Sequence, residues 1–488
     1  MAQFVSQTGM RVLLVASEAA PYAKAGGLGD VVSGLAKALK DRGHDARIVM
    51  PLYRSIDRVK HGVAYKHNQC THFGRGEEVW CGVHEALLDG RVPVVFMEHG
   101  RFFDRAGIYD DGTREYGDNA YRFTFLSKAA MQWCKDQDWI PDVIHVHDWQ
   151  TAVLPVLLRT WDRIFSPLSG TATVLTIHNI GYQGVYTPEV MEFMGLGQEH
   201  FQPDTFEDHG RLNLLKAGVR YADAITTVSP THARELLDPI GGCGLGPYLG
   251  RRQPDLHGIL NGTDYELWNP ATDRQIAAPF FPDHMEGKLA CRDALRSHFG
   301  LEHSSAPVVG IVSRLVEQKG MGLMQAMLES AVRQCSIQVV VLGTGDPAAH
   351  AFFDGLAQRH PGKVGVHIGF SSELSSRIYA GTDFFFMPSL YEPCGLSQMY
   401  AMKYGSVPVV RATGGLADTV VDSETGLVFT HPEPGDAYHA VERLSRLWYD
   451  MPGDYRRIQR RGMEQAFTWD KSVADYEDVY RKVVARYR

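Results

Sequence analysis

The stretch "RVLLVASEAAPYAKAGGLGDVVSGLAKAL" at residues 11–39 decides the fold class. Its first six residues form a near-continuous apolar run, which is typical of a strand buried on both faces of a parallel sheet. A glycine-rich loop follows at 24–32, and apolar residues then recur at helical spacing, with Asp30 as the expected helix cap. "ARIVM" at 46–50 predicts the next strand. We therefore predict a βαβ unit and an α/β protein.

The same alternation of strands and helices occurs in two separate parts of the chain. Turn-forming residues at 261–273 separate the two parts and predict a linker. Each part can therefore form its own parallel sheet. Further strands are expected at 142–148, 173–178 and 223–229 in the first part, and at 308–314, 337–343, 364–369, 383–389 and 406–410 in the second.

Length and composition narrow the class of protein. A chain of 488 residues is too long for one ordinary core, so we expect at least two domains. The formal charge of −8, from 49 basic and 57 acidic residues, argues against general binding of nucleic acid or anionic membrane. No apolar run approaches the ~20 residues that span a bilayer. The seven cysteines include no CxxC pair, so we expect free thiols and a cytoplasmic protein.

The glycine-rich loop is a candidate anion site. Its lysine, Lys24, precedes the glycines, whereas a P-loop lysine follows them, and the dinucleotide fingerprint G-x-G-x-x-G is absent. Gly26 and Gly27 would leave the N–H groups of a helix N-terminus accessible, and such a terminus attracts anions. A tight turn beside an exposed lysine is an equally good interpretation of this segment alone.

Two loops in the second part also combine charge with turn residues. "SRLVEQKG" at 313–320 places Arg314 and Lys319 at a helix start, where two cations suit a diphosphate. A solvated charge pair is the alternative. "EPCGLS" at 392–397 follows a predicted strand and offers backbone amides and a hydroxyl to an anion, with the Glu392 carboxylate available to sugar hydroxyls.

An internal similarity relates the two parts. "GGLGDVV" at 26–32 has a counterpart in "GGLADTVV" at 414–421, each with an aspartate that can cap a following helix. The similarity suggests two α/β domains that each present a helix N-terminus at the carboxyl end of a sheet. Ligands of open α/β sheets bind at that end.

Together these segments resemble the bacterial glycogen synthase and plant starch synthase family. Seven motifs occur in the order of that family, over nearly the whole chain: K-x-G-G-L-x-D (24–30), HDWQ (147–150), HNIGYQG (178–184), GILNGTD (258–264), SRLVEQKG (313–320), EPCGLSQMYAMKYG (392–405) and TGGLADTV (413–420). The resemblance implies a GT-B fold, in which two Rossmann-like domains face each other across a deep cleft. The expected domains are 1–258 and 259–470, with a C-terminal helix at 471–488 that packs back on the first domain.

The resemblance also implies an activity. Family members transfer glucose from a nucleotide diphosphate sugar, usually ADP-glucose, to the non-reducing end of an α-1,4-glucan, with retention of configuration and without a metal or other cofactor. We therefore expect ADP-glucose and an α-1,4-glucan as the partners of this chain. Front-face attack, in which the departing phosphate takes the acceptor proton, is the course that the family implies.

Site residues follow from the motifs that match. The resemblance implies catalytic roles for His178, Glu392, Arg314 and Lys319. It implies donor contacts for Lys24, Gly26, Gly27, Asn261, Phe370, Cys394, Gly395, Leu396 and Ser397. It places the acceptor near Asp148, Trp149, Tyr182 and Gln183, with His147 beside them. His145, His147 and Asp148 could be mistaken for metal ligands, but they lie along one strand without a matching set elsewhere.

Some features depart from the pattern of the family and leave other functions open. Tyr400 stands where the broader retaining group often has a second glutamate, and the segment 236–252 differs from the family's usual loop. A related transferase with UDP-glucose or a small acceptor is one alternative. A glucan-binding protein without catalysis would be expected to lose the cationic residues, which are present here. A nicotinamide-dependent dehydrogenase would need the missing dinucleotide fingerprint.

Overall fold

The computed structural model describes residues 9–488, and their contacts divide the chain into two compact units. The expected boundary at 258/259 lies four residues before the main passage into the second unit, which follows Gly262. The C-terminal segment returns to the first unit from Trp469 onward. Unit 1 comprises the described residues up to Val228 together with Ala233–Gly262 and Trp469–Arg488, and unit 2 comprises Ser229–His232 and Thr263–Thr468.

Unit 1 is built on a nine-stranded sheet of order β12-β11-β7-β6-β1-β2-β5-β4-β3. Strand β4 runs antiparallel to both of its neighbours, and the other pairs are parallel. The predicted strands at 11–16, 46–50, 142–148, 173–178 and 223–229 are confirmed. The strands are β1 (Arg11–Val15), β2 (Asp45–Pro51), β3 (Ala64–His72), β4 (Glu78–Leu88), β5 (Val92–Glu98), β6 (Val143–His147), β7 (Ala172–Ile177), β11 (Ala224–Thr227) and β12 (Leu256–Gly258).

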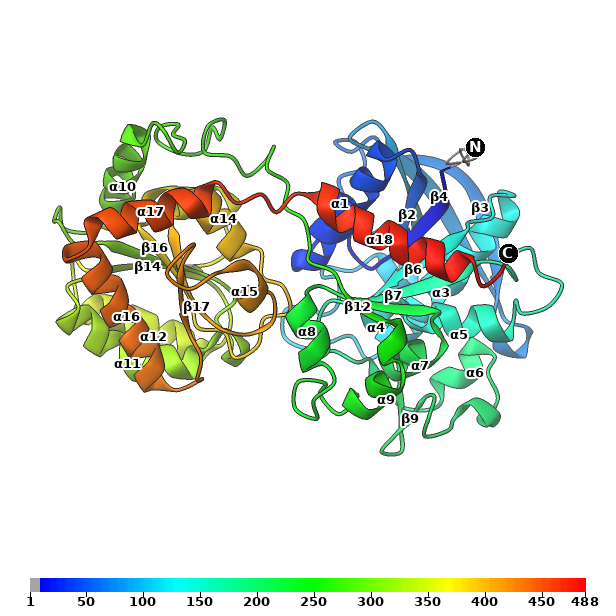
Figure 1. Cartoon of the computed structure of the whole chain (residues 1–488). Helices are drawn as coiled ribbons and strands as arrows, with labels where there is room; N and C mark the ends of the chain where they lie inside the picture. Colours follow the sequence, from blue (N-terminus) through cyan, green and yellow to red (C-terminus); the bar gives the residue numbers. More distant parts are fainter. Residues whose placement is uncertain (1–8) are drawn as a thin grey trace, which may run out of the picture. The chain divides into compact units, whose positions relative to one another are not determined.

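Helices and a small second sheet complete unit 1. The C-terminal helix α18 packs against α1, although the two lie at opposite ends of the sequence (Figure 1). The helices are α1 (Gly27–Asp41), α2 (Gly100–Phe103), α3 (Asn119–Asp136), α4 (Asp148–Thr151), α5 (Val153–Thr160), α6 (Val190–Met194), α7 (Leu214–Tyr221), α9 (Gly246–Arg251) and α18 (Trp469–Val484). Helix α8 (Pro230–Glu235) begins in the short unit 2 segment Ser229–His232 and ends in unit 1. The small sheet has the order β8-β10-β9, formed by Val185–Tyr186, Arg211–Asn213 and Glu207–Asp208.

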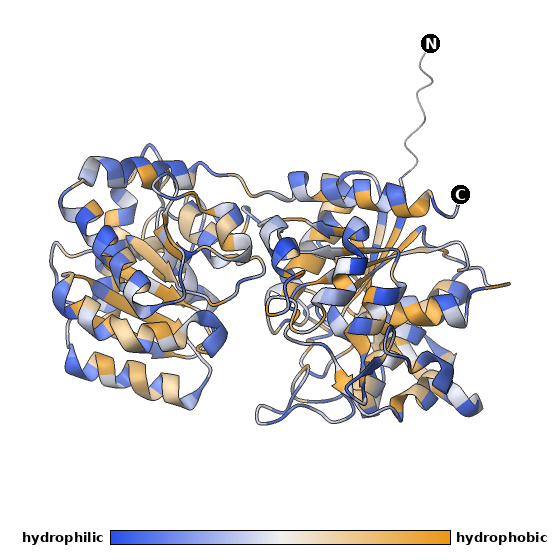
Figure 2. Cartoon of the chain, turned by 60° about the horizontal axis from the view of Figure 1, so that its bottom comes forward, coloured by the Kyte–Doolittle hydropathy of each residue, from blue (hydrophilic) through white to orange (hydrophobic). Residues whose placement is uncertain are grey.

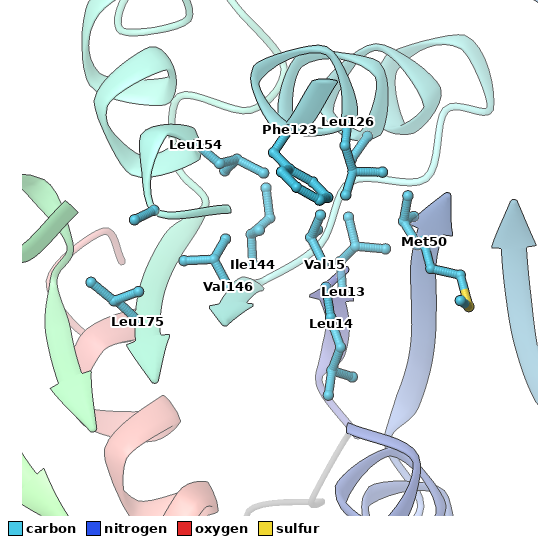
Figure 3. Close-up of a cluster of buried hydrophobic side chains, with 14 of the residues drawn as sticks. Leu13, Leu14, Val15, Met50, Phe123, Leu126, Ile144, Val146, Leu154 and Leu175 are labelled. Atoms are coloured by element: carbon cyan, nitrogen blue, oxygen red, sulfur yellow. The ribbon is translucent and has the colours of Figure 1, made fainter. Parts of the chain in front are cut away.

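The core of unit 1 lies between the central strands and the helices that cover them. Apolar side chains of β1, including Leu13 and Val15, meet Ile144 of β6 and Phe123 of α3 in one buried cluster (Figure 3). Because the central strands are covered on both faces, most of their residues are apolar, which is why the sequence predicted them.

Unit 2 contains a six-stranded, fully parallel sheet of order β15-β14-β13-β16-β17-β18. All five strands predicted in this part are confirmed. The strands are β13 (Val308–Val312), β14 (Gln338–Gly343), β15 (Val364–Ile368), β16 (Phe384–Met387), β17 (Val407–Arg411) and β18 (Leu427–Phe429). The helices are α10 (Glu286–Phe299), α11 (Met321–Gln334), α12 (Pro347–Arg359), α13 (Ser372–Gly381), α14 (Ser397–Lys403), α15 (Gly414–Thr419), α16 (Pro434–Tyr449) and α17 (Pro452–Met463).

In both units the hydrophobic residues concentrate in the strands and on the helix faces that meet them (Figure 2). This is the pattern of amphipathic helices that cover a buried sheet. Among residues 9–488, no helix combines the length and the apolar composition that spanning a bilayer requires.

Candidate active site

The glycine-rich loop of unit 1 is held by two acidic residues. The ammonium of Lys24 lies 2.9 and 3.0 Å from the two carboxylate oxygens of Asp30. The backbone N–H groups of Ala25 and Gly26 donate to one carboxylate oxygen of Glu18, at 2.6 and 3.2 Å. Asp30 was expected to cap α1, and this prediction is wrong: Gly26 is the N-cap, and Asp30 lies in the first turn. Its partner is the lysine.

Glu18 is a residue that the sequence analysis missed. Its side chain is 3% exposed, and its second oxygen accepts a hydrogen bond of 2.5 Å from the Tyr109 hydroxyl. Glu18 therefore occupies the anion position at the Ala25 and Gly26 amides. An open groove of about 490 Å³ adjoins this loop, lined by Lys24, Ser55 and Tyr109 among others. The sequence pattern that could have identified Glu18 is an acidic residue shortly after the buried strand β1.

Two histidines meet at the carboxyl ends of β6 and β7. Nδ1 of His147 lies 3.0 Å from Nε2 of His178. The ring of His145, two residues earlier on the same strand, stacks on His147 with 4.3 Å between ring centroids. The nitrogens of His145 are bonded to the Tyr480 hydroxyl at 2.7 Å and the Thr176 hydroxyl at 2.6 Å. Because both ring nitrogens have protein partners, we interpret His145 as a residue that supports His147 and His178.

Burial determines the protonation of this group. It lowers the pKa of His145 and of His178 to about 3, and it lowers the pKa of His147 well below the usual value. The three imidazoles are therefore neutral at physiological pH, and they act through directed hydrogen bonds. They do not supply positive charge.

Asp148 begins α4 with a left-handed backbone (φ 55°), which turns its side chain toward the neighbouring strand end. One carboxylate oxygen accepts the backbone N–H groups of His178 at 2.7 Å and Asn179 at 3.3 Å. Burial raises the pKa of Asp148 to about 7, and the two N–H groups oppose this rise. The residue thus links the two strand ends that carry the histidines.

The other predicted acceptor residues differ in exposure. Trp149 is buried and packs against Phe123 and Tyr186, whereas 56% of Tyr182 is exposed. The amide of Gln183 donates to the carbonyl of Cys243 at 2.9 Å. The atypical segment 236–252 therefore contacts one of the predicted acceptor residues.

In unit 2, a lysine and a glutamate from two different loops form a close ion pair. Nζ of Lys319, after β13, lies 2.5 Å from Oε2 of Glu392, after β16. The Ser389 hydroxyl donates to the same oxygen at 3.0 Å, and Glu392 is 6% exposed. Arg314 donates to the side chain of Gln318 at 3.0 Å. Both loops lie at the carboxyl end of the sheet, so two cations and a buried carboxylate gather there.

The second glycine pair packs against the glutamate loop. Gly415 N–H donates to the carbonyls of Glu392 and Pro393 at 3.0 and 3.1 Å. A Cβ at Gly414, whose φ is +43°, would lie 1.9 Å from the Glu392 carbonyl oxygen. The expected open helix N-terminus is therefore wrong for α15. Its aspartate, Asp418, is no cap either, because it accepts hydrogen bonds from Thr231.

The remaining donor candidates are spread over both units. Phe370, just after β15, is 81% exposed, while Cys394 is buried and precedes Gly395 (φ 69°) and the start of α14. Leu396 is the N-cap of that helix, Ser397 its first residue, and both are partly exposed. Asn261 is 4% exposed and belongs to unit 1. Tyr400 stacks on Trp268 with 4.3 Å between ring centroids, so that position is part of the packing.

Comparisons with known proteins agree with this arrangement. The family model for the starch synthase catalytic domain matches residues 11–251, and the model for glycosyl transferases group 1 matches residues 296–463. Glycogen synthase from Geotalea daltonii is 43% identical, over 98% of this chain and 99% of that protein. The chain belongs to the glycogen and starch synthase family. A second family member, glycogen synthase from an Anaeromyxobacter species (strain Fw109-5), is also 43% identical, over 98% of this chain and 100% of that protein.

The solved structure of a starch synthase establishes the fold class. The catalytic domain of starch synthase IV from Arabidopsis thaliana, bound to ADP and acarbose, matches with a TM-score of 0.90 and 34% identity. The match covers 98% of this chain and all of that one. The predicted GT-B fold is confirmed. Sucrose-phosphate synthase from Thermosynechococcus elongatus shares the fold alone, with a TM-score of 0.61 and 18% identity.

Proposed function

We propose that this chain is a glycogen or starch synthase that transfers glucose from ADP-glucose to the non-reducing end of an α-1,4-glucan. The observation that carries the proposal is the pairing of Lys319 with Glu392 beside Arg314, at the carboxyl end of the unit 2 sheet. Family membership supports it, because the similar curated proteins are glycogen synthases. We expect the enzyme to act in the cytoplasm.

The donor diphosphate is the part of the substrate that the unit 2 cations suit. Guanidinium and ammonium groups form strong, charge-assisted hydrogen bonds with phosphate oxygens. Arg314 and Lys319 would stabilise the negative charge that develops on the departing diphosphate. In many nucleotide-sugar enzymes Mg²⁺ has this role. We therefore propose that transfer needs no metal. When the diphosphate engages Lys319, the Glu392 carboxylate becomes available to the glucose hydroxyls.

The nucleotide and the acceptor are assigned on separate grounds. The related starch synthase was solved with ADP, which favours an adenine nucleotide, and the exposed ring of Phe370 offers a surface on which a base can stack. For the acceptor, we propose the unit 1 groups around His178, Asp148 and Tyr182. Lys24 supplies a further cation for the donor, exchanging Asp30 for phosphate.

The proposed chemistry retains configuration at the anomeric carbon. The bond from that carbon to the diphosphate oxygen breaks, and a bond to the acceptor 4-hydroxyl oxygen forms on the same face. The acceptor proton passes to the departing phosphate. The lowered pKa of His178 leaves its imidazole uncharged. The neutral ring contributes a hydrogen bond near the reacting carbon.

The test is a nucleotide-release assay with purified protein. Incubation with glycogen and ADP-glucose should release ADP in buffer that contains a chelator. The kcat/KM for ADP-glucose should exceed that for UDP-glucose. Arg314→Ala and Lys319→Ala should lower kcat by roughly 10²–10³-fold, as losing a preorganised charge commonly does. Lys363→Ala, an exposed lysine of unit 2, is the matched control. Failure to release nucleotide from either donor would refute the proposal.

A further inference from the structure

Three potential metal ligands meet at the outer edge of the unit 1 sheet. Cys70 and His72 lie on β3, and Glu78 lies on β4. One ligand atom from each residue can be chosen so that all three lie within 4.8 Å of one another. In the sheet order, four strands separate β3 from β6, which carries His145 and His147. The cluster is therefore distinct from the histidine group described above.

The strand geometry explains why these side chains gather. Alternate residues of a strand point to the same face, so Cys70 and His72 share a face. The antiparallel register places Glu78 directly opposite His72, and Trp80 opposite Cys70. The backbone is also anchored from behind, because Gln69, on the opposite face, donates to the Ala129 carbonyl of α3 at 2.9 Å. The ligand positions are thus held by the sheet.

We propose that Cys70, His72 and Glu78 form a binding site for Zn²⁺ or a similar thiophilic divalent cation. A thiolate, an imidazole and a carboxylate are all ordinary zinc ligands, and three protein ligands leave the fourth tetrahedral position for water. Zinc–ligand bonds of this kind place neighbouring ligand atoms ~3.5 Å apart. Nδ1 of His72 and a carboxylate oxygen of Glu78 are already 3.9 Å apart.

The remaining closure requires only side-chain movement. The His72 and Glu78 side chains are 60% and 55% exposed, so both can rotate without disturbing the packing. Cys70 carries a free thiol. Because it is half-buried, its side chain is the least mobile of the three. A bound cation would join β3 to β4 close to the turn between them. Because β3 is an edge strand, such a link would also stabilise the edge of the sheet.

Binding at this site is coupled to proton release. Burial raises the pKa of the Cys70 thiol, and the charges of Glu78 and Asp136 raise it further. The ionisable groups around the thiol are Glu78 and Cys81 on β4, His72 on its own strand, and Asp136 at the end of α3. A metal that binds the thiolate must displace the thiol proton.

The test uses Co²⁺ as a spectroscopic probe of the full-length protein after chelator treatment. A thiolate ligand gives a charge-transfer band in the near ultraviolet, and a tetrahedral site gives visible bands. We expect one equivalent of Co²⁺ to saturate both signals and Zn²⁺ to displace it. Cys70→Ser should abolish the charge-transfer band, and His72→Ala should weaken binding at least 10-fold. Cys243→Ser, at an exposed cysteine elsewhere in unit 1, should change neither.

Thermal unfolding provides a second readout. Zn²⁺ should raise the unfolding temperature of the parent protein and of Cys243→Ser, but not that of Cys70→Ser. Glucosyl transfer by Cys70→Ser should match the parent rate, because the site lies outside the proposed active site. A thiolate band that persists in Cys70→Ser, or that disappears in Cys243→Ser, would overturn the proposal. So would the absence of any band at millimolar Co²⁺.

Discussion

The hydroxyl of Tyr480, in the helix that ends the chain, lies 2.7 Å from Nδ1 of His145. His145 in turn stacks on His147, which is bonded to His178. The last helix of the sequence therefore supports the histidines at the carboxyl ends of β6 and β7, and its return to unit 1 has a consequence for the proposed chemistry as well as for stability.

Tyr480→Phe should weaken both the fold and the reaction. The substitution leaves a buried nitrogen of His145 without its partner, which should cost about 1–3 kcal/mol of unfolding free energy in urea titrations. Looser histidines should lower kcat several-fold while the donor KM stays unchanged, because none of the proposed diphosphate ligands contacts this histidine group. Tyr487→Phe is the control, since that hydroxyl is bonded to Asp223, away from the histidines. Equal losses of kcat in both variants would contradict the positioning role.

Lys319 and Glu392 should behave as a coupled pair. Removing one partner of a desolvated ion pair leaves the other charge uncompensated, so Lys319→Met and Glu392→Gln should each be costly. The double variant should lose less unfolding free energy than the sum of the two, by about 1–3 kcal/mol. Its activity should remain low, because both groups are proposed to act on the donor. Strict additivity of the unfolding free energies would show that the pair is not coupled in solution.

Lys288 is expected to be a major contributor to the stability of unit 2. Its buried ammonium faces four backbone carbonyls, those of Tyr379, Ala380, Thr382 and Tyr404, at 2.7–3.2 Å. Lys288→Met should therefore lower the unfolding free energy by at least about 3 kcal/mol, because it leaves buried acceptors unsatisfied. Lys363→Met, at an exposed position, should change it by less than about 0.5 kcal/mol. Similar values for the two variants would show that the buried contacts contribute little.

The sequence predicted most of the parallel strands of both units, because these strands are buried on two faces and are mostly apolar. It did not identify the parallel strands β5, β12 and β18. It also missed the antiparallel pair β3 and β4, in which polar residues such as Asn68 and Glu85 alternate with apolar ones, so that no long apolar run marks them. The proposed metal ligands lie on these same strands. In the sequence, these ligands appear as a cysteine and a histidine two residues apart, followed by Glu78 across a turn. This pattern indicates a metal site only when the strand register is known.

At the site, the sequence identified charged groups but not their partners. Lys24, Arg314, Lys319 and Glu392 stand in loops at strand ends, as motif spacing predicted. Which carboxylate each cation meets depends on tertiary contacts, because Lys319 and Glu392 are 73 residues apart in the chain. The second glycine pair, Gly414 and Gly415, was misread for a related reason. A glycine needed for close packing and one needed for ligand approach look alike in sequence.

Asp148 should make stability depend on pH in a recognisable way. Its pKa is about 7 in the folded protein, against an ordinary value of 3.8. Between these values the folded state keeps a proton that the unfolded state has lost. The contribution to stability therefore declines as pH rises through this window, by at most about 1.4 kcal/mol per unit. Asp148→Asn keeps an acceptor for the His178 amide but cannot ionise.

Urea unfolding of the parent and Asp148→Asn at several pH values between about 5 and 8 provides the measurement. The difference in unfolding free energy between the two proteins should shift steadily in favour of the variant as pH rises. Other ionisable groups contribute equally to both and cancel. Two parallel profiles would show that the buried carboxyl titrates near its ordinary value.

Gly414→Ala should separate catalysis from stability. A Cβ there would approach the Glu392 carbonyl oxygen to 1.9 Å, and φ of +43° is unfavourable for alanine. The Glu392 loop must therefore shift, and a displacement of even 1 Å in a catalytic group can cost about 10²-fold in rate. Gly435→Ala is the matched control, because nothing lies within 4 Å of a Cβ at that glycine and alanine favours its helix. Activity and urea unfolding of both variants give the comparison. We expect Gly414→Ala to lose most of its activity while remaining folded and Gly435→Ala to retain both, whereas full activity in Gly414→Ala would show that the Glu392 loop tolerates displacement.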